Sequence, residues 1–401
     1  MAEVNRVRTI GADKAPMVHL VDNHDEAYHL WRRAGASGRT LVHVDAHHDM
    51  AWLDHVGLID IGNYVCQAMR DGVVNEVVWV VPDASWATRS GRSVLRRHLN
   101  TLVKHYPGKT GPIQISDRQL STRLLEVPVT ICALDSLPEI KPTILLDIDV
   151  DFFTLPRVEF LRDDRPGETP WRWPAEFLSA LRRKHLNTDF VTIAYSVAGG
   201  YVPMKWKYLG DELALEWQSG SADSERAKEG FRLLRNAALA QGSSHSAEAI
   251  ADLRQAAILV SKSAAPHLNL ALLHLSAGDV SQAKDEFLLA VKADASCRGP
   301  HASRGFVCLS EGRNDEAHRE FRQILALDPH NPFGLLGLGR IAVQRRQWND
   351  AEHFLRAAIA VEPRLIDAHR YLGDTLIRLR RDKEAAVAYS RSLKLAYSGP
   401  S

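Results

Sequence analysis

The sequence predicts two parts: a three-layer α/β domain with a parallel sheet between helices, followed by an all-α solenoid. Three observations lead to this prediction. Short, continuous apolar runs recur up to about residue 220, helical patterns separate them, and a 34-residue period then replaces the strand pattern. Continuous apolar runs are typical of strands buried on both faces. We therefore expect domains at residues 1–221 and 222–401, joined near "SGSADSE" (219–225).

The runs expected as strands are rich in β-branched residues. They are residues 17–22, 40–45, 76–82, 127–134, 142–150 and 189–196. Segments between them, such as "DEAYHLWRRAG" (25–35) and "GNYVCQAMRDG" (62–72), have helical spacing and end at glycine, so we expect helices there. Strands that alternate with helices in this way predict a doubly wound sheet.

The charge balance, the apolar runs and the cysteines indicate which classes of protein the sequence does not favour. Lys and Arg number 50 against 49 for Asp and Glu, so net charge favours neither a nucleic-acid nor a membrane partner. The sequence has no signal-peptide pattern at its start and no apolar run long enough to span a bilayer. Its four cysteines form no CxxC pair, which fits free thiols in a reducing compartment. We expect a cytoplasmic protein.

Three positions keep the 34-residue period. They are a small residue at 237, 271, 305, 339 and 373, an alanine at 249, 283, 317, 351 and 385, and a bulky residue at 253, 287, 321, 355 and 389. Small residues let two antiparallel helices touch, and the bulky residue fills the gap to the next pair. The pattern resembles the tetratricopeptide repeat, in about five copies over residues 230–397.

Two of the expected strands end in acidic clusters. "LVHVDAHHDM" (41–50) supplies Asp45, His47 and Asp49, and "ILLDIDVDFF" (144–153) supplies Asp147, Asp149 and Asp151. Residues i, i+2 and i+4 of an extended chain point the same way. Ligands of open α/β sheets bind at the carboxyl ends of the strands. We therefore expect the two clusters to meet at one edge of the sheet.

These clusters predict a shared metal site. Buried carboxylates are unfavourable unless they are paired or metal-bound, and no basic residue lies between Lys141 and Arg157. Five carboxylates and at least one imidazole are enough for two ions, and this donor set suits Mn²⁺ better than a thiolate-type zinc. The alternative is a pair of solvated loops, with Asp45 capping a helix.

The clusters resemble the paired motifs of the arginase and ureohydrolase superfamily, DAHxD and SxDxD. Here these are "DAHHD" and "LDID", and "LVDNHD" supplies His24 where the family has a histidine after an earlier strand. With "VDNHDEAY", the motifs resemble more specifically the peptide arginases. Those enzymes convert arginine residues of a precursor peptide to ornithine during maturation of ribosomally made peptides. The resemblance covers about residues 15–210.

The resemblance implies the fold that arginases and deacetylases share. It also implies that the protein is a hydrolase that binds two Mn²⁺ per chain and releases urea. It implies that His24 and Asp49 hold one ion, that His47 and Asp149 hold the other, and that Asp45 and Asp147 bridge them. The repeats lie outside the resemblance. We expect them to bind the precursor peptide or to join subunits into a homo-oligomer.

Two family positions lack their usual residues. The proton-shuttling histidine falls near "IGNYV" (61–65), which has none, so His55 is the candidate proton shuttle and His48 the alternative. The guanidinium-binding glutamate falls on the expected strand 189–196, which has no acid after Asp189. Its candidate replacements are Asp151, Asp211 and Glu212.

A rival interpretation comes from "SVAGGYVP" (196–203). It resembles the glycine-tyrosine loop of the metal-dependent deacetylases, in which Tyr201 would polarise the substrate carbonyl; a tight turn at Gly199 and Gly200 is the simpler alternative. Those enzymes typically use one zinc and lack equivalents of His24 and Asp49. The presence of both His24 and Asp49 therefore favours the manganese hydrolase over a zinc deacetylase. A non-catalytic repeat scaffold is the third alternative.

Overall fold

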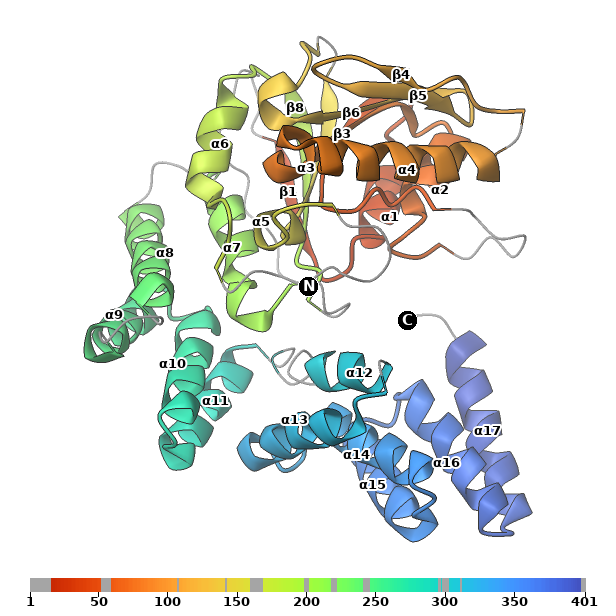
Figure 1. The fold of residues 1–401 in the computed structure, drawn as a ribbon. Helices are drawn as coiled ribbons and strands as arrows, with labels where there is room; N and C mark the ends of the chain where they lie inside the picture. The colour runs from red at the N-terminus through yellow and green to blue at the C-terminus, as the bar shows by residue number, and fades with distance from the viewer. Residues whose placement is uncertain are drawn as a thin grey trace. The chain divides into compact units, whose positions relative to one another are not determined.

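The structure is a computed structural model. It describes residues 16–51, 59–106, 108–140, 143–158, 169–197, 202–217, 222–240, 246–294, 297, 303–310 and 312–397. Contacts within the chain define two compact units, Met1–Leu239 and Ala240–Ser401. The first is mixed α/β and the second is helical (Figure 1). Within the described residues, no helix is both long enough and apolar enough to cross a membrane.

The first unit contains an eight-stranded sheet in the order β1-β8-β7-β2-β3-β6-β5-β4 (Figure 1). The strands are β1 Met17–Val21, β2 Arg39–Val44, β3 Val74–Val81, β4 Gln114–Ile115, β5 Leu120–Leu124, β6 Val127–Ala133, β7 Ile144–Asp149 and β8 Thr188–Ala194. The six strands expected from the sequence are present and run parallel to one another. β5 and β4 extend the sheet antiparallel at one edge, which the sequence did not predict.

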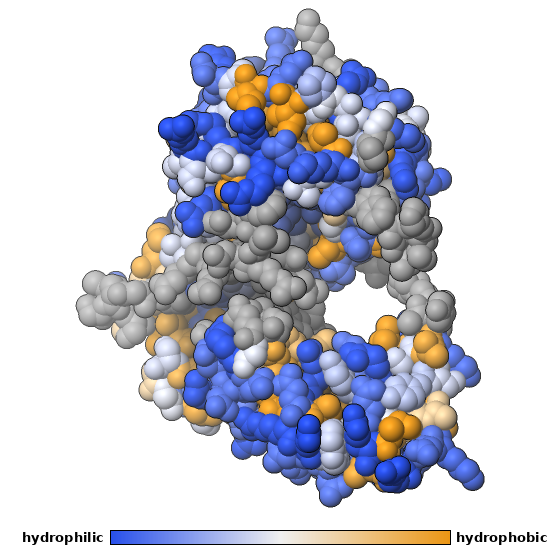
Figure 2. Space-filling view, turned by 45° about the vertical axis from the view of Figure 1, so that its right-hand side comes forward, coloured by the Kyte–Doolittle hydropathy of each residue, from blue (hydrophilic) through white to orange (hydrophobic). Residues whose placement is uncertain are grey.

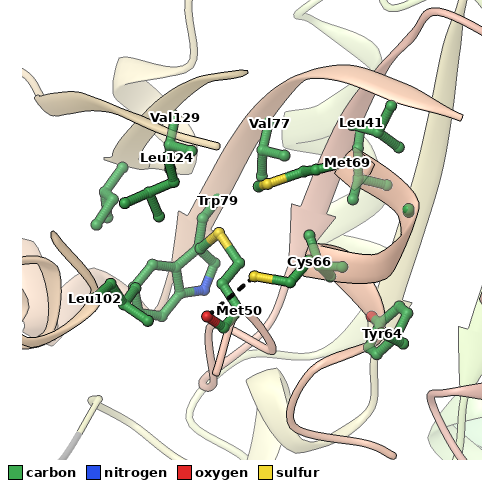
Figure 3. Close-up of a cluster of buried hydrophobic side chains, with 14 of the residues drawn as sticks. Leu41, Met50, Tyr64, Cys66, Met69, Val77, Trp79, Leu102, Leu124 and Val129 are labelled. Carbon is green, nitrogen blue, oxygen red and sulfur yellow. Dashed lines mark hydrogen bonds between the residues drawn. The ribbon is translucent and has the colours of Figure 1, made fainter. Parts of the chain in front are cut away.

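The central strands are buried on both faces. Leu41 of β2 and Trp79 of β3 pack among helical residues on one face (Figure 3), and Val42 and Val78 are equally buried on the other. The helices of this unit are α1 Glu26–Arg33, α2 Tyr64–Arg70, α3 Asp83–Ala87, α4 Arg89–His105, α5 Asp151–Thr154, α6 Pro174–Arg182, α7 Tyr208–Leu215 and α8 Ala222–Ala240. Helices α1, α2 and α4 contribute to the core around Trp79, and α7 contacts β1 and β8.

The loop after β2 is fastened to this core. The indole Nε1 of Trp79 donates to the carbonyl of Asp45 at 2.9 Å. The thiol of Cys66 donates to the carbonyl of Met50 at 3.2 Å (Figure 3), and burial, which raises the pKa of that thiol to about 11, keeps it protonated. Tyr106 donates to the carbonyl of Ala51 at 3.0 Å. The hydrophobic core therefore fixes the backbone that carries the first acidic cluster.

Helix α8 belongs to the first unit, whereas the sequence pattern suggested a boundary at residue 221. Phe231 of α8 stacks on Tyr208 of α7, with ring centroids 6.0 Å apart. Arg235 pairs with the buried carboxylate of Glu212 at 2.7 Å. These two contacts join α8 to α7.

The second unit is a row of paired helices. They are α9 Ser246–Leu259, α10 Ala265–Ser276, α11 Val280–Ala293, α12 Ser303–Ser310, α13 Asn314–Leu327, α14 Pro332–Gln344, α15 Trp348–Val361, α16 Ile366–Arg378 and α17 Asp382–Tyr397. A Cβ added at Gly305 of α12 would lie 2.5 Å from the ring of Phe321 on α13. One period later, a Cβ at Gly339 would lie 2.8 Å from Leu355. The periodic small and bulky residues are thus packing partners within each helix pair.

Candidate metal centre

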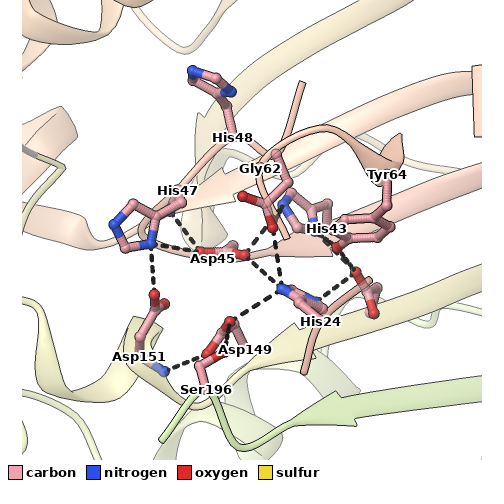
Figure 4. A network of polar contacts seen from close by, with 12 residues as sticks. His24, His43, Asp45, His47, His48, Gly62, Tyr64, Asp149, Asp151 and Ser196 are labelled. Atoms are coloured by element: carbon pink, nitrogen blue, oxygen red, sulfur yellow. Dashed lines mark hydrogen bonds and ion pairs between the residues drawn. The ribbon is translucent and has the colours of Figure 1, made fainter. Parts of the chain in front are cut away.

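The two acidic clusters meet at the carboxyl edge of β1, β7 and β2 (Figure 4). His24 lies in the turn after β1, Asp45, His47 and Asp49 lie in the loop after β2, Asp147 and Asp149 lie on β7, and Asp151 begins α5. All six residues expected as ligands therefore lie in one region, although three segments of the chain supply them.

Three carboxylates converge on one ring nitrogen of His24. Its Nδ1 lies 3.1 Å from Asp45 Oδ2, 3.2 Å from Asp49 Oδ2 and 3.1 Å from Asp149 Oδ2. Within the described residues, neither ring nitrogen of this buried imidazole has a hydrogen bond of good geometry. Atoms bound about 2.1 Å from one ion, at right angles to each other, lie about 3.0 Å apart. This spacing is that of ligands around one cation.

A second group of possible ligands surrounds His47. Its Nδ1 lies 2.6 Å from Asp151 Oδ2 and 3.6 Å from Asp45 Oδ1. The backbone N–H groups of His47 and Ala46 donate to Asp45 Oδ1 at 2.6 Å and Asp151 Oδ1 at 3.3 Å. Asp45 thus presents Oδ2 to the group around His24 and Oδ1 to the group around His47, as a carboxylate that bridges two ions does.

Asp147 occupies a different place from the one expected. It pairs in register with His43 of β2 and Thr192 of β8, two residues before Asp149, and so lies about 6–7 Å deeper along the strand. Its carboxylate accepts hydrogen bonds from Tyr64 at 2.7 Å, from Thr192 and from His43 Nδ1 at 3.0 Å. Asp147 thus lies beside His24 and His43, with which it could share an ion, rather than beside His47. Asp151 stands beside His47 instead.

The electrostatics of the cluster favour a cation. Burial, together with the charges of Asp151 and Asp49, raises the pKa of Asp45 to about 8. Burial and Asp151 also raise the pKa of Asp149. Carboxylates crowded in this way retain a proton near neutral pH unless a cation takes its place. Within the described residues, no Lys or Arg forms an ion pair with these carboxylates.

Two residues at the site hold unusual backbone conformations. Asp49 and Ser196 both have φ of 49°, a left-handed region that non-glycine residues rarely adopt and that is found at functional sites. The hydroxyl of Ser196 donates to the carboxylate of Asp149. Sequence reasoning did not identify Ser196 as a site residue, although it is the last residue of the expected strand 189–196 and lies at the same edge of the sheet.

A pocket of about 170 Å³ opens onto the cluster. Its described lining is His24, Ala46, His47, His48, Asp49, Ala51, Ile61, Gly62, His98, Asp149, Asp151, Val158 and Ser196. His48, considered as a proton shuttle, accepts a hydrogen bond from the N–H of Met50 at 3.0 Å. Burial and the neighbouring His98 lower its pKa to about 3, so the ring is neutral. His98, on α4, carried no signal in the sequence.

Four residues that the sequence suggested for catalysis or for guanidinium binding remain to be placed. His55 and Tyr201 lie outside the described residues. Asp211 accepts a hydrogen bond from the hydroxyl of Tyr195, and Glu212 pairs with Arg235. Neither acid belongs to the described lining of the pocket, so neither is placed to hold a guanidinium beside the cluster.

Comparison with known proteins gives a family match within the second unit. A tetratricopeptide repeat family model matches residues 309–370. A fragment of MamA from Desulfovibrio magneticus RS-1, residues 41 to the end, is 18% identical, with 43% of this chain and 98% of that chain covered and a TM-score of 0.24. YrrB, described as a TPR protein with an unusual peptide-binding site, is 16% identical, with 45% and 95% covered and a TM-score of 0.25. No curated protein matches the chain. The chain thus combines a mixed α/β unit with a helical region of tetratricopeptide-repeat type.

Proposed function

We propose that this protein is a binuclear manganese hydrolase that converts arginine residues of a peptide to ornithine, with release of urea. The observation that carries the proposal is the pair of ligand groups around His24 and His47, which share the two oxygens of Asp45. Two divalent cations would balance the four carboxylates of these groups, Asp45, Asp49, Asp149 and Asp151. The motif resemblance adds the reaction type.

In this proposal each residue of the cluster has one role. His24, Asp49 and Asp149 would hold the first ion, His47 and Asp151 would hold the second, and Asp45 would contribute one oxygen to each. Carboxylates and imidazoles without thiolate suit Mn²⁺. When bound, two such ions activate water for attack at neutral pH.

The pocket supports a single long side chain as the substrate. Ile61 and Val158 belong to its described lining and would contact the methylene chain of an arginine. Its volume of about 170 Å³ is below the range of about 300–1,000 Å³ typical of pockets that enclose a whole small ligand. A single side chain of a peptide therefore fits better than a complete metabolite.

The repeats supply a second binding surface in this proposal. Repeat solenoids offer extended surfaces for peptides or protein partners. Leu289 of α11, Ile377 of α16 and Val387 of α17 are exposed apolar residues on these helices, and Figure 2 shows apolar residues interspersed with polar ones on the surface in view. A precursor peptide bound there would be concentrated at the metal centre. Self-association through the same helices is the alternative.

The test is incubation of the full chain and Mn²⁺ with arginine-containing peptides, followed by mass spectrometry and a urea assay. Loss of about 42 Da per arginine together with equimolar urea is expected from hydrolysis of the guanidinium group. Removal of an acetyl group gives about the same mass change, so urea distinguishes this reaction from the deacetylase alternative. Asp45→Ala is the inactive control. Unchanged peptides across a broad panel, with two Mn²⁺ bound, would contradict the proposed reaction.

A further inference from the structure

A second layer of polar side chains lies beneath the candidate metal centre. It consists of His43, Tyr64, Asp147 and Thr192, and we call it the buried polar layer. All four side chains are completely buried, and Figure 4 shows the rings of His43 and Tyr64 beside that of His24. A charged carboxylate at such a position needs partners that compensate for the lost water.

The carboxylate of Asp147 already has those partners. Oδ1 accepts a hydrogen bond from Thr192. Oδ2 accepts hydrogen bonds from the hydroxyl of Tyr64 at 2.7 Å and from His43 Nδ1 at 3.0 Å. An ion bound at Oδ2 would have to displace donors that are already in place there. The four carboxylates nearer the sheet edge are enough to balance two divalent cations without it.

Asp147 instead contacts the imidazoles of His24 and His43. In each ring it contacts the nitrogen that faces away from the carboxylates of the ligand groups. It is 2.8 Å from Nε2 of His24, whose Nδ1 faces the three converging carboxylates. It contacts Nδ1 of His43, whose Nε2 lies 3.3 Å from Asp45 Oδ2. A carboxylate behind a metal-binding histidine orients the ring. Asp147 contacts His24 as an ion-pair partner and His43 through a hydrogen bond.

We propose that Asp147 is a positioning residue of the metal centre and not a ligand. It holds His24 with Nδ1 toward the first ion and holds His43 against the bridging carboxylate of Asp45, with Tyr64 and Thr192 fixing Asp147 in turn. This inference rests on the proposed metal centre, and it makes a distinct prediction. Removing the charge of Asp147 weakens the ion held by His24 and leaves the ion held by His47 nearly unchanged.

The experiment measures two-site Mn²⁺ binding by equilibrium dialysis with metal analysis, on the full chain stripped by chelation. The variants are Asp147→Asn and Tyr64→Phe. Asp45→Asn is the ligand comparator, and Asp189→Asn, at the exposed start of β8, is the control. Asp147→Asn should still bind two ions, one of them about 10- to 100-fold more weakly. Tyr64→Phe should show a smaller loss at the same ion, Asp45→Asn should bind fewer than two ions, and the control should match wild type.

Saturation of Asp147→Asn at one ion, as in Asp45→Asn, would make Asp147 a ligand and overturn the inference. Equal weakening of both ions would indicate general structural damage and would also overturn it. If Asp147→Asn does not fold by circular dichroism, Tyr64→Phe decides, because wild-type affinity in that variant contradicts a positioning role. Wild-type protein that binds no Mn²⁺ overturns the metal centre and this inference together. Two bound ions without urea overturn only the hydrolysis.

Discussion

Nδ1 of His47 lies 2.6 Å from Oδ2 of Asp151, although the two residues are 104 positions apart in the sequence. The contact exists because β2 and β7 are parallel neighbours, so both strands end at the same edge of the sheet. If these residues hold the second ion, Asp151→Asn should lower bound Mn²⁺ from two ions to one. Turnover should fall by roughly 100-fold or more, because each ion supplies several kcal/mol.

Metal analysis of the purified variant, beside the exposed Asp135→Asn as a control, measures this effect. Two tightly bound ions in Asp151→Asn would show that His47 and Asp151 form a metal-independent pair.

The depth of each aspartate on β7 illustrates what the sequence determines and what it leaves open. The alternation of Asp147, Asp149 and Asp151 correctly places carboxylates near the edge of the sheet. It does not say at which aspartate the strand ends, because all three have the same spacing. The pairing of Asp147 with His43 inside the sheet and the turn into α5 at Asp151 set the depth. Sequence reasoning therefore found the region, but it could not tell which of the three aspartates lies beside His47, where the structure has Asp151.

The missed elements have different physical origins. β5 alternates buried and exposed residues, and β4 has two exposed residues, so neither has the continuous apolar character that marks the parallel strands. His98 reaches the pocket from a long helix, where no local pattern distinguishes it from other polar residues. The repeats were predicted best, since helix pairs contact their sequence neighbours and the packing positions recur at a fixed interval.

The indole of Trp79 is expected to support the metal centre from the core. Its Nε1 donates to the carbonyl of Asp45, so Trp79→Phe leaves a buried acceptor without its partner and costs about 1–3 kcal/mol of unfolding free energy. We also expect weaker Mn²⁺ binding, since the loop loses an anchor. Urea unfolding and metal titration measure the two effects. Trp86→Phe is the control, because it removes an indole hydrogen bond to the carbonyl of Asp117, away from the site. It should leave the Mn²⁺ affinity intact. An equal loss of affinity in both variants would argue against a specific role of Trp79 in holding the loop.

Glu212 should make the stability of the first unit depend on pH. Burial raises the pKa of this carboxyl to about 7, although Arg235 opposes the shift. A raised folded-state pKa gives stability that is complete below the ordinary value of 4.5 and is lost as the pH rises through about 7. Between about pH 5 and pH 8, wild type should therefore lose more unfolding free energy than Glu212→Gln.

Urea unfolding of both proteins at the two pH values measures the difference. Glu225→Gln, at an exposed carboxylate that pairs with Lys228, should behave as wild type does. Identical pH dependence in wild type and Glu212→Gln would show that Glu212 ionises normally.

The contact between Gly373 and Tyr389 should tolerate no added methyl group. A Cβ at Gly373 would lie 2.7 Å from the ring, and the hydroxyl of Tyr389 is held by Asp374 at 2.6 Å, so the ring cannot easily move away. Gly373→Ala should therefore destabilise the repeats by about 1–3 kcal/mol. Gly339→Ala, which meets the flexible Leu355 at the same repeat position, should cost less. Thermal unfolding compares the two, and equal effects would mean that side-chain stiffness does not matter there.

The place where the chain is cut should decide whether the catalytic unit survives without the repeats. A chain that ends at residue 221 loses Phe231, which covers Tyr208, and Arg235, which pairs with the buried Glu212. Removing one partner of a buried ion pair costs about 3–5 kcal/mol, so we expect this fragment to unfold or aggregate. A fragment that ends at Leu239 keeps both contacts and should fold.

The fragment of residues 1–239 also tests the role of the repeats. If they bind the precursor, this fragment should process a short arginine peptide as the full chain does, while its KM for a full-length precursor rises, because the second contact that concentrates the substrate is lost. Circular dichroism and Mn²⁺ content establish that the fragment is intact before the kinetics are compared. Equal KM values for the full chain and the fragment on both substrates would assign the repeats to another partner.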